Sequence, residues 1–355
     1  MSHFTVLVVG NNPEEQLAPF QENNCGDCPE EYLSFTDTEE ESLKEYETGT
    51  AKRAVMPDGR LLSPWDEEFK IKDDLLGAGQ DTHKVPEGIP VREVPYKEIF
   101  PTFEDFMKEW HGHDERDQKI GKYGYWENKN SKWDWYELGG RFRGFFKLKH
   151  PNVQKVLGEP GVFNNEPEYD SDQALKGQVD FEGMMEDAGK KAKEQYETVE
   201  RLLGGEIPKI EVSWKEIIDP KNIRFSGMDI EEKRTFFHNQ SAMLKLKQIK
   251  EDILKQTKED IKEDAKKVSE DLELLMWLDL ENYQMSKEEF IERAKTVTIS
   301  TFAVIKDGKW FERGKMGWWG IISNEKDEKE WDNQFQTLLS DLPDDTLLSI
   351  YDCHI

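Results

Sequence analysis

The hydrophobic residues of this chain gather in short runs near its two ends, whereas the middle shows a helical spacing. Residues 4–9 form a β-branched run that stops at Gly10 and Pro13, the pattern of a strand followed by a turn. Asp307 and Gly308 separate two apolar segments and are a hairpin signal. The sequence predicts strands at residues 4–9, 91–96, 298–305, 318–323 and 346–351, and an aromatic hairpin at 132–149.

Helices are predicted where apolar residues recur every three or four positions behind a capping residue. Thr102 precedes Glu104 and Asp105, whose negative charges suit the first turn of a helix. The sequences TDTE at residues 36–39 and SKEE at residues 286–289 are capping-box patterns, which also start helices. The other predicted helices cover residues 101–110, 184–203 and 327–340.

A long apolar stripe runs through residues 229–278. Lys and Glu occupy the other faces, so the spacing is that of amphipathic helices. Two helices folded as a hairpin within this chain satisfy the pattern, and a coiled-coil contact with a partner is the alternative. The members of the stripe are Leu246, Ile249, Ile253, Ile261, Ala265, Val268, Leu272 and Leu275.

Two pairs of short segments are similar, and both pairs occur in the same order along the chain. SHFTVLVVG at residues 2–10 resembles STFAVIKDG at 300–308, and WYELG at 135–139 resembles WFERG at 310–314. These pairs predict two related half-units that share one sheet and are separated by a long insertion. The expected fold is therefore α+β, with a ferredoxin-like, pseudo-duplicated sheet formed by both chain ends.

The chain divides into three regions of different character. Residues 1–179 are expected to supply the N-terminal half of the α+β domain and to carry an acidic, irregular excursion over residues 14–88. Residues 180–296 form a helical insertion, and residues 297–355 complete the sheet.

Charge narrows the range of partners. The chain has 75 acidic and 48 basic residues, which gives a formal net charge of -27. Such a field repels nucleic-acid phosphates and anionic lipids, so direct nucleic-acid binding is not expected. The acidic surface suits a partner protein with a basic surface, whereas a local basic pocket suits a nucleotide-like small molecule.

Targeting and redox signals agree on one compartment. No apolar run is long enough to span a bilayer, and residues 4–9 are too short for a signal peptide and lack a basic flank. Three cysteines in 355 residues imply no disulfide framework. We therefore expect a cytoplasmic protein without a membrane association.

Three segments resemble an uncharacterised family of phage and prophage proteins. They are the start MSHFTVLVVGNNPEEQLAP, the sequence WDWY at residues 133–136 with GGR at 139–141, and the end IYDCHI. The resemblance covers both ends and the central aromatic segment, but not the acidic excursion or the helical region. It implies a phage origin and expression in the bacterial host cytoplasm. It brings no activity, so no catalytic residue is assigned.

Aromatic, arginine and glycine residues of the central segment and its C-terminal counterpart form the main candidate site. Ring faces and guanidinium groups suit a nucleotide or another planar anion, and glycines allow close approach of the backbone. The alternative is that the rings fill the core and the glycines make turns. The residues are Trp133, Trp135, Tyr136, Gly139, Gly140, Arg141, Arg143, Trp310, Arg313, Trp318 and Trp319.

Two weaker patterns involve cysteine and histidine. Cys25 and Cys28, together with His111 and His113, offer four zinc ligands, although a single C-x2-C pair and the tight histidine spacing fit zinc poorly. The alternative is a solvated loop with free thiols, and no other cofactor is expected. Cys353 is next to His354, but neighbours on a strand point to opposite faces, so we expect Cys353 in the core.

These observations favour a non-enzymatic accessory protein that acts by binding in the host cytoplasm and interferes with a host process or defence system. The sequence has no Walker loop, Rossmann glycine fingerprint or nucleophile elbow. The alternative is a metal-dependent nucleotide hydrolase or phosphoesterase whose acidic residues hold a divalent metal. A virion component is a third class, which the irregular acidic insertions do not favour.

Overall fold

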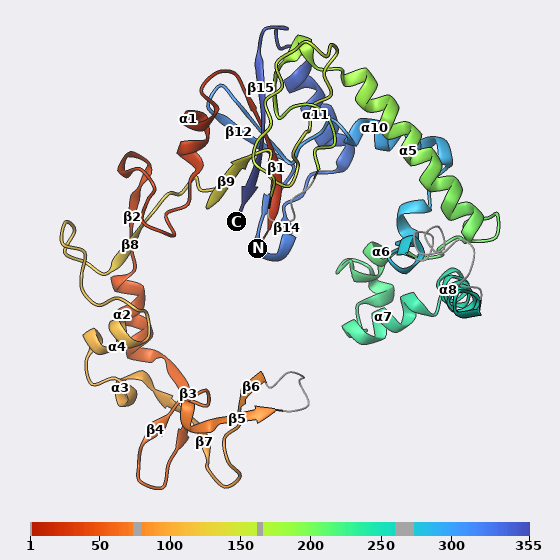
Figure 1. Cartoon of the computed structure of the whole chain (residues 1–355). Helices are drawn as coiled ribbons and strands as arrows, with labels where there is room; N and C mark the ends of the chain where they lie inside the picture. Colours follow the sequence, from red (N-terminus) through yellow and green to blue (C-terminus); the bar gives the residue numbers. More distant parts are fainter. Residues whose placement is uncertain (1, 74–79, 162–165, 260–272) are drawn as a thin grey trace. The chain divides into compact units, whose positions relative to one another are not determined.

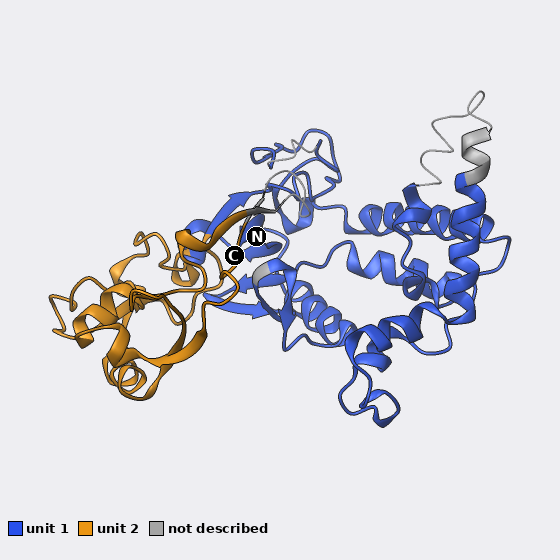
Figure 2. Ribbon diagram, turned by 90° about the horizontal axis from the view of Figure 1, so that it is seen from below, with its two compact units in different colours: residues 1–17, 135–355 blue, residues 18–134 orange. Residues whose placement is uncertain are grey.

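The computed structural model describes residues 2–73, 80–161, 166–259 and 273–355. They fall into two compact units, which Figure 2 draws in different colours. The sheet–helix unit comprises residues 1–17 and 135–355, and the excursion unit comprises residues 18–134. The helical region therefore belongs to the same compact unit as the sheet, whereas the excursion forms a unit of its own.

Both chain ends build the central sheet of the sheet–helix unit (Figure 1). Its strands are β1 (His3–Val9), β9 (Trp135–Leu138), β10 (Gln173–Leu175), β11 (Ala303–Lys306), β12 (Lys309–Glu312) and β15 (Leu347–His354). Their order is β10-β15-β1-β11-β12, and β9 pairs with the C-terminal half of β15. The predicted α+β fold with a sheet from both chain ends is confirmed. The sheet is mixed, because β1 runs parallel to β11 and antiparallel to β15.

The similar segments at the two ends are direct neighbours in this sheet. Val6 pairs with Ala303 and Val8 pairs with Ile305 in parallel register. The second similar pair lies in β9 and β12, which are at opposite edges of the sheet. β9 runs parallel to β1, since both are antiparallel to β15, whereas β12 runs antiparallel to β11. In the N-terminal half the two similar segments, β1 and β9, thus run parallel to each other. In the C-terminal half their counterparts, β11 and β12, run antiparallel.

One face of the sheet packs against α11 (Glu328–Ser340), and we call it the α11 face. Asp327 caps the start of this helix, because its side chain accepts a hydrogen bond from the backbone N–H of Lys329. The buried residues of this core include Leu7, Val9, Val304, Leu348 and Ile350 of the sheet, and Trp331, Phe335 and Leu339 of α11. The opposite face is covered as well, because Phe4, Val6, Val8 and Cys353 are also buried. The short helix α1 (Pro13–Leu17) follows β1.

The helical region is built around α5 (Phe181–Leu202) and α10 (Lys287–Val297), which pack side by side (Figure 1). α5 ends before Gly204 and Gly205, both at positive φ, and α10 begins with the predicted capping box of Ser286 and Glu289. Between them lie α6 (Trp214–Ile218), α7 (Ile230–His238) and α8 (Ser241–Glu259). Among the described residues, no helix is both long and apolar enough to cross a membrane.

The apolar stripe packs inside this unit as far as it is described. Leu246 and Leu275 are buried in one cluster with Tyr196 and Val199 of α5. Ile249 and Ile253 pack against the same cluster. The described part of the stripe therefore follows the intramolecular alternative. The predicted members Ile261, Ala265, Val268 and Leu272 lie outside the described residues.

Two predicted strand regions are wrong. Residues 132–149 do not form a hairpin, because β9 pairs with the distant β15 and the residues after it form only single bridges. The chain turns at Gly139 and Gly140 instead, both at positive φ. Residues 318–323 contain a 3-10 turn over Trp318–Gly320, and only β14 (Ile322–Ser323) is a strand, paired with β13 (Lys315–Met316).

The excursion unit is more regular than the sequence predicted. Its strands are β2 (Ser34–Asp37), β3 (Thr50–Val55), β4 (Leu61–Leu62), β5 (Lys70–Asp73), β6 (Gln80–His83), β7 (Val91–Pro95) and β8 (Gly124–Glu127), and its helices are α2 (Glu39–Thr48), α3 (Tyr96–Ile99) and α4 (Phe103–Glu109). β7 is an edge strand beside β3, as predicted, and Thr102 caps α4 in a capping box with Asp105. Aromatic residues make up for the sparse aliphatic ones, because Tyr96, Phe100 and Phe106 share one core.

Candidate functional site

A histidine–aspartate pair with a buried carboxylate lies where β1 and β15 meet on the α11 face. His3 Nδ1 is 3.0 Å from Asp352 Oδ1 and 3.1 Å from Oδ2. The Asp352 side chain is fully buried, and its Oδ2 also accepts a hydrogen bond of 2.9 Å from the backbone N–H of Arg141. Such a carboxylate fixes the orientation of the imidazole, so that His3 presents a defined ring nitrogen to its other side.

Trp135 and His354 surround this pair. The Trp135 ring centroid lies 6.2 Å from that of His3 and 6.4 Å from that of His354, both edge-on, and the two histidine rings are 5.0 Å apart. Trp135 is half exposed, so the cluster reaches the surface at this point. Burial raises the pKa of the nearby Glu137 carboxyl, and the negative charge of Asp352 raises it further.

Cys353, the possible nucleophile nearest to this cluster in the sequence, is not positioned to react there. Cys353 is next to Asp352 in the chain, but it points to the opposite face of the sheet and is fully buried. Burial raises the pKa of its thiol well above the ordinary value, so the reactive thiolate is disfavoured. The expectation that Cys353 packs into the core is confirmed. The cluster is therefore suited to hold an oriented histidine rather than to activate this thiol.

The two glycines after β9 approach internal carboxylates. A Cβ atom at Gly139 would lie 2.3 Å from Asp172 Oδ2, and one at Gly140 would lie 2.6 Å from the Cβ atom of Asp352. Asp172 Oδ1 in turn accepts a hydrogen bond of 2.6 Å from the backbone N–H of Gly144. These glycines therefore allow close packing inside the protein, the structural alternative that the sequence left open.

The residues of the predicted aromatic–arginine site do not gather at one place. Trp135, Tyr136, Gly139, Gly140 and Arg141 lie on β9 and in the loop after it. Trp310 lies on β12, and Arg313 follows it. Four strand spacings of about 4.8 Å separate β9 from β12, which is roughly 19 Å. Trp133 is buried and belongs to the excursion unit.

Several of these side chains already have partners within the protein. Arg143 Nε donates to the carbonyl oxygen of Gly158 at 2.8 Å, and Arg313 Nη2 pairs with Glu325 at 2.6 Å. Trp310 Nε1 donates to Glu312 at 2.7 Å, and the rings of Tyr136 and Tyr351 meet edge to face at 5.4 Å. Trp319 is 80% exposed and is the middle residue of the turn that replaces the predicted strand.

The four residues of the weak zinc candidate all lie in the excursion unit. Cys25 is exposed, whereas Cys28 is buried and its Sγ donates to the carbonyl oxygen of Gln21 at 3.5 Å. His111 Nε2 pairs with Glu45 at 3.2 Å, and burial lowers the pKa of His113. Within the described ranges, no group of three or more His, Cys, Asp or Glu side chains is placed to hold a metal.

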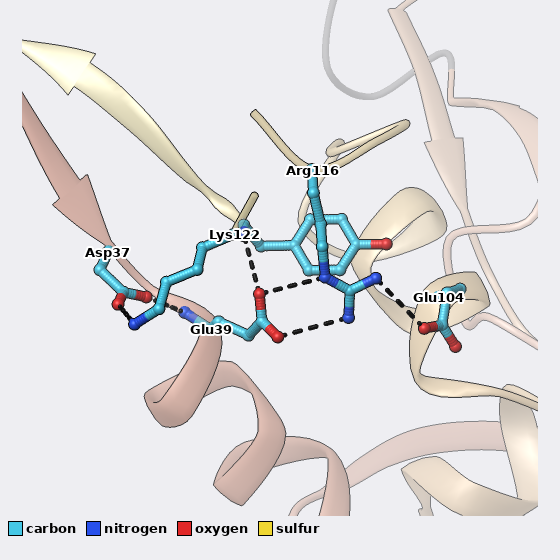
Figure 3. Close-up of polar contacts among 6 residues, drawn as sticks. Asp37, Glu39, Glu104, Arg116 and Lys122 are labelled. Carbon is cyan, nitrogen blue, oxygen red and sulfur yellow. Dashed lines mark hydrogen bonds and ion pairs between the residues drawn. The ribbon is translucent and has the colours of Figure 1, made fainter. Parts of the chain in front are cut away.

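The sequence did not reveal an ion-pair network in the excursion unit, which Figure 3 shows. Arg116 binds both carboxylate oxygens of Glu39 at 3.2 and 3.3 Å, and it reaches Glu104 at 3.5 Å. Its guanidinium carbon lies 4.5 Å from the ring centroid of Tyr123. Lys122 pairs with Asp37 beside it. The network connects β2, α2, α4 and residues 116–123, so it holds these segments of the excursion unit together.

The sequence also missed a cavity in the helical region of the sheet–helix unit. The cavity has a volume of about 570 Å³, and Trp277 lies at it with 85% of its surface exposed. Its charged lining residues are Glu273, Asp279, Arg293, Arg313 and Glu328. One feature of the sequence could have indicated this cavity. Trp277 is a large apolar residue that does not belong to the apolar stripe, although Leu275 does, and an amphipathic helix favours polar residues outside such a stripe.

Carboxylates also dominate two other cavities of this unit. One of about 700 Å³ is lined by Glu211, Asp229, Glu231 and Glu232 with Arg224 as the basic residue. Another of about 680 Å³ is lined by Glu289, Glu292, Asp327, Glu328 and Asp332, with Arg293 and Lys329 as the basic residues. Each of these three cavities therefore has more carboxylates than basic residues in its lining, in contrast to the basic pocket that a nucleotide requires.

Comparison with protein-family models, curated proteins and solved structures gives no match for this chain.

Proposed function

We propose that the protein is a phage accessory protein that acts by binding a basic host protein in the bacterial cytoplasm, and that it thereby interferes with a host process or defence system. The phage origin and the location rest on the resemblance of its two ends and central aromatic segment. The net charge of -27 supports a basic partner, because opposite fields steer association.

The observation that carries the proposal is the combination of exposed apolar side chains and carboxylates in the helical region. Ile223 is 89% exposed and Trp277 is 85% exposed. Ile230, Leu244 and Met276 are about half exposed on the same region. Apolar anchors that become buried on association, surrounded by charged groups, are typical of protein interfaces.

A nucleotide-like ligand has less support. It would need stacked rings and available guanidinium groups at one place, but β9 and β12 lie at opposite sides of the sheet. Arg143 and Arg313 also have partners within the protein. The enzyme alternative, a metal-dependent nucleotide hydrolase or phosphoesterase, predicts turnover of a nucleotide that depends on a divalent metal.

Capture from bacterial lysate at low and high salt tests the proposal. The full chain should retain basic proteins at low salt and release them at high salt, because salt screens exposed charges over a Debye length of about 10 Å at 0.1 M. Ile223→Ser combined with Ile230→Ser should weaken the capture of the same proteins. Trp65→Ala is the matched control, since Trp65 is 74% exposed in the excursion unit.

A purified candidate partner should then bind the full chain in calorimetry with the same salt dependence and the same response to the variants. The proposal fails if the captured proteins are not basic, or if neither high salt nor the Ile223→Ser and Ile230→Ser double substitution reduces their capture. Thermal unfolding with a nucleotide and divalent-metal panel runs in parallel, because a ligand of the folded state raises the midpoint. A midpoint shift with a nucleotide would favour the nucleotide-binding candidate instead.

A further inference from the structure

We infer that the cavity beside Trp277 is a receptor for an arginine side chain of a basic peptide segment. This inference rests on the proposed function and names the site and the chemistry by which the partner is recognised. The cavity lies between the segment that contains Trp277 and the helix α10, within the sheet–helix unit.

The walls of the cavity are aromatic and aliphatic. Tyr283 and Phe290 stack at a centroid distance of 5.0 Å with their planes 21° apart. Tyr283 is fixed further by the side chain of Gln195, which donates to its hydroxyl at 2.8 Å. Trp277, by contrast, is 85% exposed, so its ring offers a free face at the cavity. A rigid apolar wall with one exposed indole is suited to stacking on a flat group.

The charges at the cavity favour a cation. Each lining arginine is already paired, Arg293 with Glu328 and Arg313 with Glu325, both at 2.6 Å. Glu273 and Asp279 are the remaining charged lining residues. Glu273 pairs with no basic group among the described residues. Asp279 is held in place, because its Oδ1 accepts the backbone N–H of Glu281 at 3.0 Å.

Arginine matches this combination better than lysine or an anion does. Its planar guanidinium can stack on the indole while its N–H groups donate to a carboxylate, whereas an ammonium group offers no flat face. A phosphate or carboxylate ligand would meet the negative charges of Glu273 and Asp279. The volume of about 570 Å³ exceeds that of one side chain, so the cavity has room for the residues that flank the arginine.

Calorimetry on the full chain with three matched peptides tests the inference. The probes are an acetylated, amidated Gly/Ser peptide with a central arginine, the same peptide with citrulline, and the same peptide with lysine. Citrulline keeps the size and shape of arginine but carries no charge. We expect the arginine peptide to bind at least about tenfold more tightly than the citrulline peptide, a ratio that corresponds to about 1.4 kcal/mol.

Two variants and one control locate the site. Trp277→Ala should abolish the binding of the arginine peptide, and Glu273→Gln should reduce the preference for arginine over citrulline. Trp319→Ala is the control, because Trp319 is 80% exposed in the same unit and does not line the cavity. Circular dichroism confirms that each variant is folded, which is expected since both tryptophans are exposed.

Equal binding of the arginine and citrulline peptides, or unchanged binding by Trp277→Ala, overturns the inference, and so does a failure of the arginine peptide to bind. Competition by adenosine monophosphate would also overturn it, since that result assigns the cavity to an anion.

The failure of this inference can be distinguished from the failure of the proposed function. If Trp277→Ala captures basic host proteins as the unchanged chain does, the inference fails and the proposed function stands. If the arginine peptide binds at Trp277 but no basic protein is captured, the inference stands alone.

Discussion

His3 and Asp352 are 349 positions apart in the chain, yet His3 Nδ1 lies 3.0 Å from the carboxylate of Asp352. The contact is possible because β1 and β15 are neighbouring antiparallel strands, in which His3 pairs with His354 and Thr5 pairs with Asp352. The same carboxylate binds the backbone N–H of Arg141 at the turn after β9. One buried side chain therefore links three segments of the sheet.

Asp352→Ala should strongly destabilise the sheet–helix unit. It removes a buried acceptor and leaves the Arg141 N–H and the His3 ring without their partner, and breaking a buried pair typically costs about 3–5 kcal/mol of unfolding free energy. Urea unfolding followed by circular dichroism measures the change. Asp345→Ala is the control, because Asp345 is exposed and should shift stability by less than about 0.5 kcal/mol. Equal effects of the two substitutions would show that Asp352 is not a structural link.

Gly140→Ala should cost more stability than Gly204→Ala. Both glycines have positive φ, +52° and +85°, so alanine strains the backbone at either position by about 1–2 kcal/mol. Only the alanine at position 140 also causes a steric clash. A Cβ atom at Gly140 would lie 2.6 Å from the Cβ atom of Asp352, whereas no atom lies within 4 Å of a Cβ atom at Gly204. The overpacking should add about 1–3 kcal/mol at Gly140. Thermal unfolding of the two variants compares them directly, and equal midpoints would contradict the close packing of Gly140 on Asp352.

Glu39 should make the excursion unit sensitive to acid. The backbone N–H of Tyr123 and then the guanidinium of Arg116 hold the pKa of Glu39 below its ordinary value. A carboxyl group whose pKa is lower in the folded state stabilises the fold above its unfolded pKa, near 4.3. This stabilisation is lost as the pH falls from there through the folded pKa.

Thermal unfolding of Glu39→Gln and the unchanged chain across this pH range measures the effect. The midpoints should differ most near neutral pH and converge as the pH falls below about 4. Glu98→Gln serves as the control, because Glu98 is exposed on α3 and no network surrounds it among the described residues. A midpoint difference that grows on acidification would mean that Glu39 does not stabilise the fold in its charged form.

One thiol should react quickly with an aromatic disulfide reagent in the native protein. Cys25 is exposed, whereas Cys28 and Cys353 are buried and burial raises the pKa of both thiols. Because the thiolate is the reacting form, the two buried thiols should react only as the protein opens. Absorbance should record one rapid equivalent in the native state and all three in denaturant. Cys25→Ser should remove the rapid phase, and its persistence in that variant would show that a second thiol is accessible.

The sequence predicted those elements whose signals lie within a few residues. The α4 helix follows the capping box of Thr102 and Asp105, α11 follows Asp327, and α5 ends before Gly204. Each of these signals acts between residues only a few positions apart, so the pattern in the sequence is also the physical cause. The acidic charge, the buried strand at residues 4–9 and the α+β class were also evident at this level.

Tertiary structure alone decided which strands pair and which side chains meet. The aromatic stretch at 132–149 has the composition of a hairpin, but β9 pairs with β15, more than two hundred residues later. Trp135 and Arg313 lie on different sides of the sheet although similar segments contain them. Trp277 lies at a cavity that only the packing of distant segments creates. Local spacing carries no information on such contacts, because they depend on the burial of whole faces and on long-range loop closure. The sequence by itself therefore determined the elements and their charge, and the fold decided the candidate sites.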